Sequence, residues 1–368
     1  MDVSEFDFDL PPELIAQEPP ADRSAARLMA LDRIRGSIVH THVAELPRLL
    51  RAGDLVVVNN TRVFPARLLG RRVPSGGAVE CLLIRSLGSD GGQMGVRHPS
   101  APGPDPRLTP ELWEALVHPG QKLKPGALVI FEGIRTLHGE VLDRRFHGRR
   151  VVRLWTDDGA SVDDAVDAIG HVPLPPYIKR DDRPDDRDRY QTVFARARGS
   201  VAAPTAGLHF SPSLIASLLD RGLHVAEITL HVGYGTFQPV RVARVEDHRL
   251  EPERYEIGPA AVDAINSALA EDRRVIAVGT TTTRTLEAVA RAHDGHVIAG
   301  SGSTDLFIHP GFDFRIVGGL LTNFHLPRSS LLMLVSAFAG RDLVRTAYHA
   351  AIAERYRFYS YGDAMLIL

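Results

Sequence analysis

Two short runs of the sequence bring a histidine together with glycine and hydroxyl side chains. Residues 205–209 read Thr-Ala-Gly-Leu-His, and residues 231–235 read His-Val-Gly-Tyr-Gly. A neutral imidazole can accept or donate a proton near pH 7, and glycine lets a backbone come close to a ligand. We therefore predict that His209 and His231 carry protons, unless each is only a structural hydrogen-bonding group at a strand end. The neighbours expected to bind or position a small polar ligand are Thr205, Gly207, Gly233, Tyr234 and Gly235.

A third candidate lies in residues 321–330, a polar loop directly before an apolar segment. In this loop Asn323 can donate and accept hydrogen bonds, His325 can transfer a proton, and Arg328 can hold a carboxylate or phosphate. A polar cluster beside an apolar helix is typical of the floor of a pocket. Asp363 either belongs to the same site or caps the C-terminal turn.

Residues 278–284, Val-Gly-Thr-Thr-Thr-Thr-Arg, lead from an apolar strand into a helix. Backbone amides at a helix N-terminus favour an anion. We expect Thr280 and Arg284 to contact such a group, and N-capping of the helix by threonine is the alternative. The chain has neither a Gly-x-x-x-x-Gly-Lys-Ser/Thr loop nor a Gly-x-Gly-x-x-Gly loop.

The run of residues 179–189 contains five basic and five acidic side chains. Such a balanced run is most simply a solvated, mobile loop. Tyrosines flank it, and arginine and tyrosine together are typical of single-stranded RNA recognition, so an RNA-binding loop is the other interpretation.

No motif in the sequence indicates a metal site. The 16 histidines include no His-Glu-x-x-His pair, and Cys81 is the single cysteine. We predict no metal and no prosthetic group, and we expect Cys81 to be a buried strand residue.

The composition is that of a soluble globular protein. The chain has 368 residues, 44% hydrophobic and 24% charged, with a formal charge of -2. This length favours two domains. The apolar run at residues 330–339 is too short to span a bilayer and predicts a buried helix. Acidic residues occupy the N-terminus where a secretory leader needs basic ones, so we expect a cytoplasmic protein without membrane contact.

The chain changes in character after residue 66. Residues 53–59 predict a turn and a strand buried on both faces. Short apolar runs at residues 66–72, 79–85, 128–132, 138–142 and 151–155 then predict several strands, as in a small barrel or sandwich. Five prolines between residues 97 and 111 predict a surface loop without a strand and without a catalytic role.

Helical periodicity returns beyond residue 155. Helices are predicted at residues 211–220, 259–271 and 283–293, and strands at 225–232 and 275–279. This alternation indicates an α/β layer. The predicted fold is a discontinuous α/β main domain, residues 1–66 and 154–368, with a mixed sheet or barrel-like core and flanking helices. An all-β barrel-like domain, residues 67–153, is inserted into it.

Ordered motifs along the whole chain resemble the S-adenosylmethionine:tRNA ribosyltransferase-isomerase family of queuosine biosynthesis, the QueA family. They lie at residues 6–17, 27–29, 58–67, 170–178, 190–194, 201–210, 230–240, 278–280, 321–327 and 359–365. The run of four threonines departs from the family's more mixed residues there, so Thr282 and Thr283 are assigned no role. The resemblance implies the same discontinuous domain arrangement.

The resemblance also implies an activity. The ribosyl part of S-adenosylmethionine would be transferred and isomerised onto 7-aminomethyl-7-deazaguanine at the wobble position of tRNA with a GUN anticodon. The products would be epoxyqueuosine in tRNA, adenine and methionine, with S-adenosylmethionine as a consumed co-substrate. For this chemistry we expect three histidines to transfer protons, namely His209, His231 and His325. Hydrogen-bond donation to the substrate, or its positioning, is expected of Asn323, Thr205 and Tyr234. Arg284 and Arg328 are expected to hold a carboxylate or phosphate. We expect a monomer.

Two other classes remain open from the sequence. One is a non-catalytic RNA-binding factor that uses the all-β insert. The other is a small-molecule lyase or hydrolase on an α/β scaffold that acts without RNA.

Overall fold

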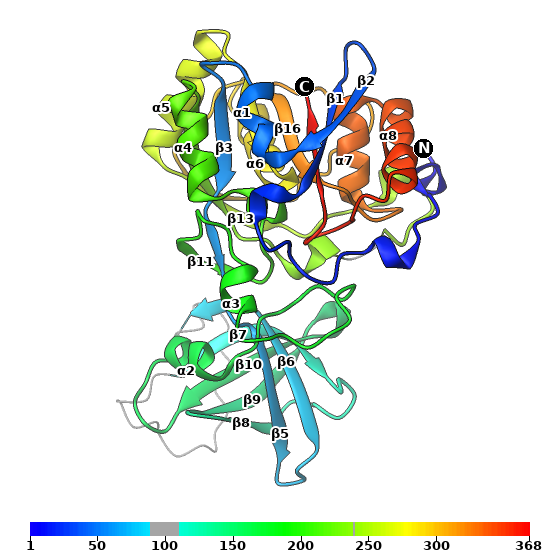
Figure 1. Ribbon diagram of the computed structural model, residues 1–368. Coiled ribbons are helices and arrows are strands. Elements are labelled where there is room, and N and C mark those ends of the chain that lie inside the picture. Colours follow the sequence, from blue (N-terminus) through cyan, green and yellow to red (C-terminus); the bar gives the residue numbers. More distant parts are fainter. Residues whose placement is uncertain (89–109, 238–239) are drawn as a thin grey trace. The chain divides into compact units, whose positions relative to one another are not determined.

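The computed structural model describes residues 1–88, 110–237 and 240–368. The chain divides into two compact units (Figure 1). The first comprises Met1–Arg62, Pro175–Asp181 and Asp188–Leu368, and the second comprises Val63–Leu174 and Asp182–Arg187. The first unit is therefore discontinuous in sequence.

A nine-stranded mixed sheet forms the centre of the first unit. Its four middle strands run parallel, and antiparallel pairings flank them on both sides. In spatial order the strands are β15 (Gly300–Thr304), β13 (Glu253–Ile257), β12 (His224–Leu230), β3 (Leu55–Asn59), β14 (Val275–Val278), β16 (Val317–Asn323), β17 (Ala364–Ile367), β1 (Arg27–Asp32) and β2 (Ser37–His42).

The side chains of strand β3 show that the sheet is covered on both faces. All five of its residues are buried, as its continuous apolar sequence predicts. Leu55 and Val57 belong to one hydrophobic cluster, and Val56 and Val58 belong to another. Because successive side chains of a strand point to opposite faces, the two clusters lie on the two sides of the sheet.

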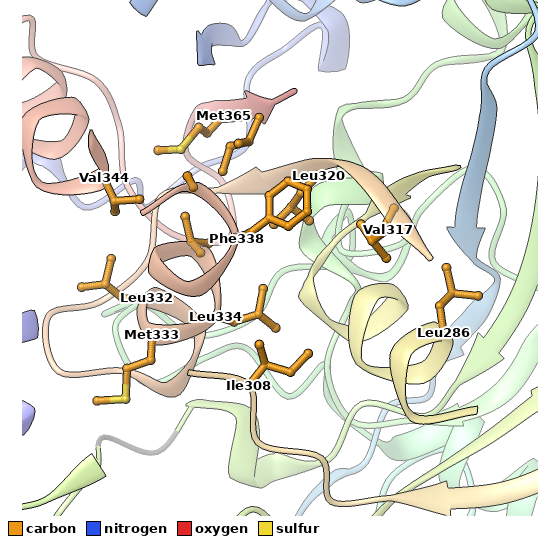
Figure 2. Close-up of a cluster of buried hydrophobic side chains, with 14 of the residues drawn as sticks. Leu286, Ile308, Val317, Leu320, Leu332, Met333, Leu334, Phe338, Val344 and Met365 are labelled. Carbon is orange, nitrogen blue, oxygen red and sulfur yellow. The ribbon is translucent and has the colours of Figure 1, made fainter. Parts of the chain in front are cut away.

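Helices supply the outer layers of this unit (Figure 1). Their bounds are α1 (Leu46–Leu49), α4 (Pro212–Asp220), α5 (Pro259–Ala270), α6 (Thr280–Ala292), α7 (Ser330–Ala339) and α8 (Arg341–Ala353). Side chains of α1 and α4 pack in the cluster of Val56, whereas those of α5 to α8 pack in the cluster of Leu55. Figure 2 shows part of the larger cluster, which includes Leu334 and Phe338 of α7 and Leu320 of β16. The predicted α/β fold with a mixed sheet and flanking helices is confirmed.

The second unit contains a closed barrel in which all strand pairings are antiparallel. Its strands are β5 (Arg67–Val73), β6 (Ala78–Gly88), β7 (Glu111–His118), β8 (Leu128–Glu132), β9 (Thr136–Arg144) and β10 (Arg149–Thr156), and helix α2 (Val162–Ile169) follows them. Cys81 is buried on β6, as expected. The prediction of a small all-β barrel is confirmed.

Two local predictions are corrected. Strand β7 was not predicted, and it begins at Glu111, which we had assigned to the proline-rich loop. Pro110 is described and belongs to no strand, and residues 97–109 of the predicted loop, including Pro99, Pro102, Pro104 and Pro106, lie outside the described residues. Helix α6 begins at Thr280, three residues before the predicted start, because Gly279 adopts φ 90° as its N-cap.

Candidate functional site

The predicted site residues gather at one edge of the main sheet. Strands β12, β3, β14 and β16 are parallel, so their carboxyl ends lie at the same edge. His231 follows β12, Thr61 follows β3, Thr280 follows β14 and Asn323 ends β16. Ligands of open α/β sheets bind outside the carboxyl ends of the strands.

A pocket of about 690 Å³, partly open to solvent, lies at this edge within the first unit. Four predicted residues line it, namely Thr205, Thr280, Asn323 and His325. The structure thus brings together residues from three separate sequence motifs.

The side-chain amide of Asn323 contacts two other groups near the pocket. Its Nδ2 donates to the carbonyl oxygen of Tyr359 at 3.0 Å and lies 3.2 Å from Nε2 of His209. An amide nitrogen has two hydrogens, so Nε2 of His209 can accept the second one and the ring then carries its proton on Nδ1. Burial, with Arg357 and Arg23 nearby, lowers the pKa of His209 to about 4, which agrees with a neutral ring.

His209 itself is the last residue of a short 3-10 helix, Thr205–His209. It is buried and lines a second, smaller hollow of about 270 Å³ together with Arg23 and Arg189. His325, which the sequence places in a polar loop, is buried as well. Sequence periodicity could not reveal this burial, because neither residue lies in a long periodic segment.

His325 is held from two sides. Its Nε2 lies 2.8 Å from Oγ1 of Thr322, and its backbone N–H donates to the hydroxyl of Tyr348 at 2.9 Å. Burial lowers the pKa of His325 to about 3. The imidazole is therefore neutral at pH 7 and available as a hydrogen-bonding group or as a proton acceptor.

His231 lies at the same sheet edge but does not line the pocket. Its Nδ1 is 2.8 Å from Oγ1 of Thr61, and its ring packs against Gly199, where a Cβ atom would come within 2.8 Å of Cε1. Burial, followed by the charge of Arg254, lowers the pKa of His231.

The predicted glycines and Tyr234 also do not line the pocket. Gly207 is buried, and a Cβ atom there would meet Cγ2 of Thr192 at 2.9 Å, so its small size serves close packing. Gly233 donates its N–H to Oε1 of Glu253 at 2.8 Å. Gly235 approaches Glu251, and Tyr234 begins the 3-10 helix Tyr234–Phe237.

Both predicted arginines have acidic partners. Arg284 is buried on α6 and forms an ion pair with buried Glu253 of β13. Arg328 is half exposed, forms an ion pair with Asp7 and donates its backbone N–H to the carbonyl of Phe6 at 2.9 Å. Neither lines the pocket.

Several pocket residues were not predicted. Thr281 lines the pocket in addition to Thr280, and Tyr177, Tyr359 and Ser360 complete its wall. The tyrosines occur in the motifs at residues 170–178 and 359–365, which was the available signal. N-capping of α6 by threonine, the alternative for this run, is wrong because the cap is Gly279 and no side chain bonds it.

Two further predictions can be compared with the structure. Asp363 is buried and accepts backbone N–H bonds from Arg27 and Arg357, so it caps the C-terminal turn. The run at residues 179–189 is not a simply solvated loop. Arg180, Arg187 and Arg189 donate to backbone carbonyl oxygens, and Asp186 is buried.

Among the described residues, no group of three His, Cys, Asp or Glu side chains is arranged to hold a metal ion. None of the described helices is long and apolar enough to cross a membrane.

The chain is similar to curated proteins over its full length. It is 50% identical over 366 residues to the S-adenosylmethionine:tRNA ribosyltransferase-isomerase of Geobacter sulfurreducens, covering 99% of each chain. It is 47% identical over 368 residues to the protein of that name from Desulfitobacterium hafniense, covering 100% of each. The crystal structure of S-adenosylmethionine tRNA ribosyltransferase from Thermotoga maritima matches with a TM-score of 0.53 and 37% identity, covering 99% of this chain and 100% of that one.

A family model described as queuosine biosynthesis protein matches residues 3–367. The match and the full-length relatives agree with the motifs recognised in the sequence. The chain belongs to the queuosine biosynthesis protein family.

Proposed function

We propose that this protein is an S-adenosylmethionine:tRNA ribosyltransferase-isomerase. The observation that carries the proposal is the match over the full length of both chains, at 47–50% identity, to relatives of that name. The pocket at the carboxyl edge of the sheet supports it, because polar side chains line it at the edge where ligands of open α/β sheets bind.

The acceptor is 7-aminomethyl-7-deazaguanine at the wobble position of tRNA with a GUN anticodon. The ribosyl part of S-adenosylmethionine is transferred and isomerised, which gives epoxyqueuosine in tRNA, adenine and methionine. S-adenosylmethionine is consumed as a co-substrate, and neither a metal nor a prosthetic group takes part. The protein acts as a monomer in the cytoplasm.

The chemistry begins with removal of a proton from the 5′-methylene group, which the neighbouring sulfonium acidifies. Adenine departs, the amine of the nucleobase attaches to the opened sugar, and methionine leaves as the epoxide closes. His325 is our first candidate for the proton acceptor, because it is the histidine among the described residues that line the pocket.

Asn323 links the pocket to a second proton carrier, His209, through its amide nitrogen. Thr205 and Thr280 line the same pocket and can donate to a developing alkoxide. We propose a structural role at the carboxyl edge of the sheet for five of the predicted residues: His231, Gly207, Gly233, Tyr234 and Gly235. Arg284 and Arg328 reach an anionic group only if their acidic partners release them.

We place the catalytic domain at residues 1–66 and 154–368 and the inserted domain at residues 67–153. Every proposed site residue lies in the first compact unit, which supports assignment of the chemistry to the main domain.

The test is product analysis with purified protein, S-adenosylmethionine and tRNA that carries the 7-aminomethyl-deazaguanine base. Adenine and methionine are expected in equal amounts, together with a modified tRNA that has gained the ribosyl mass. Matched tRNA without the modified base is the control and should release neither. A product in which the tRNA has gained only a methyl group would contradict the proposal.

A further inference from the structure

Two buried polar atoms of residues that line the pocket have no hydrogen-bond partner in the described part of the chain. They are Oδ1 of Asn323 and Oγ1 of Thr281, whose residues are 2% and 5% exposed. Buried polar atoms in native proteins nearly always have a partner. A ligand in the pocket would supply the missing bonds.

The hydrogen-bonding role of each atom is fixed by its surroundings. Asn323 donates through Nδ2 to the carbonyl of Tyr359, so the amide presents its oxygen as a free acceptor. The hydroxyls of Thr282 and Thr283 donate to the carbonyls of Val278 and Gly279, four residues earlier. Thr281 makes no such bond, so its hydroxyl is free to donate to a ligand.

The rest of the pocket favours a flat, uncharged group. The rings of Tyr177 and Tyr359 form part of its wall, with centroids 4.6 Å apart. None of the described lining residues is Asp, Glu, Lys or Arg, and burial keeps His325 neutral. Aromatic side chains stack on nucleobases of any sequence, whereas an unpaired charge in such a place is costly.

Among the parts of the substrates, adenine fits these features best. Its amino group donates a hydrogen bond beside ring nitrogens that accept one, and asparagine commonly pairs with this edge. The methionine end of the co-substrate carries a carboxylate and an ammonium group, and the aminomethyl group of the nucleobase is cationic at pH 7. Both require charged partners that the pocket lining does not provide.

We infer that this pocket is the adenine subsite, in which Oδ1 of Asn323 accepts from the 6-amino group and Oγ1 of Thr281 donates to a neighbouring ring nitrogen. The inference rests on the proposed function and adds to it which half of S-adenosylmethionine is recognised there. It assigns to Asn323 a role in specificity and introduces Thr281 as a binding residue.

The test uses neutral nucleosides as competitors of S-adenosylmethionine in the adenine-release assay with unaltered protein. Adenosine should compete. Purine riboside, which lacks the 6-amino group, should bind about tenfold more weakly, the loss expected for one buried hydrogen bond. Of 1-deazaadenosine and 7-deazaadenosine, one should show a similar loss, because one ring nitrogen accepts from Thr281.

Substitutions show which residue is responsible for each loss of competitor affinity. In Asn323→Leu, adenosine and purine riboside should bind equally, and in Thr281→Val the sensitive deaza compound should match adenosine. Thr282→Val is the matched control, because its hydroxyl is buried and bonded within the helix, and it should keep the full discrimination.

The outcomes separate the two proposals. If unaltered protein releases no adenine from S-adenosylmethionine and the modified tRNA, the proposed function fails. If adenine is released but adenosine does not compete, or if purine riboside and both deaza compounds bind as well as adenosine, only the subsite is overturned. The comparison on unaltered protein decides this even if a variant does not fold.

Discussion

His209, His325 and Asn323 are polar side chains that are buried in the fold, and their burial determines their protonation and hydrogen bonding. A buried imidazole with a pKa of about 4 or about 3 is neutral at pH 7, and it is a weaker base than a free imidazole. The imidazolium that it forms on accepting a proton is a strong acid and passes the proton on readily. The same burial makes each ring part of the packing, so function and stability are coupled at these positions.

We expect His325→Ala and His209→Ala to lower single-turnover rates by about a hundred- to ten-thousand-fold, the usual contribution of a general acid or base. Each should also reduce the free energy of unfolding by about 1–3 kcal/mol, because a buried partner loses its hydrogen bond. Rates at saturating substrate and urea melts on the same samples measure both. A variant whose folded fraction reacts at the normal rate would show that its histidine is structural.

The lowered pKa values also predict how stability depends on pH. The unfolded chain binds protons at His209 and His325 near pH 6.5, whereas the folded chain does so only near about 4 and about 3. The contribution of these two neutral histidines to the free energy of unfolding is therefore fully present above pH 6.5. It falls as the pH decreases from 6.5 towards 4, by up to about 1.4 kcal/mol per pH unit for each histidine.

Urea melts at pH 7.5, 6 and 5 measure this dependence. His325→Gln should reduce the slope by the part that His325 contributes, since glutamine does not titrate, and should leave the part from His209. The control His224→Gln replaces an exposed side chain and should leave the slope unchanged. An equal slope in His325→Gln and in unaltered protein would contradict the assignment.

Among the elements, α6 shows how much the sequence could predict. Its strand-to-helix transition was predicted from the apolar run and the threonines, and α4, α5 and β3 were predicted closely because caps and periodicity are local signals. The partner of Arg284 could not be predicted, since Glu253 lies on β13, 31 residues away. Strand β7 was missed because the prolines before it suggested a longer loop. The pocket itself depends on sheet order, which no local pattern contains.

The ion pair between Arg284 and Glu253 joins α6 to β13 in the buried interior. Arg284→Met should therefore cost about 3–5 kcal/mol of stability, because it leaves a carboxylate buried without its partner. Combining it with Glu253→Gln should recover part of this loss. Arg345→Met removes an exposed pair with Asp342 on α8 and should cost less than about 1 kcal/mol. Urea denaturation compares the variants, and equal losses for Arg284→Met and Arg345→Met would contradict a structural role for the buried pair.

At the scale of the whole molecule, the formal charge of -2 provides no general attraction to nucleic acid. Affinity for tRNA must then come from local groups of basic side chains, because phosphate binding depends on the release of counterions. The run at residues 179–189 is the group that the sequence indicates. Three of its arginines, Arg180, Arg187 and Arg189, donate to backbone carbonyls, and Arg180 also forms an ion pair with Glu18.

We predict that neutralising Arg180, Arg183, Arg187 and Arg189 to glutamine weakens tRNA binding and makes it less dependent on salt. If each arginine contacts one phosphate of a single-stranded region, the slope of log affinity against log salt should fall in magnitude by at most about 2.8. The control variant neutralises three exposed arginines, Arg35, Arg48 and Arg345, and should change the slope little. Because three of the four arginines also donate to the backbone, thermal melts must show that the variant is folded at the assay temperature. An unchanged slope in a folded variant would assign these arginines to the structure of the loop and not to RNA binding.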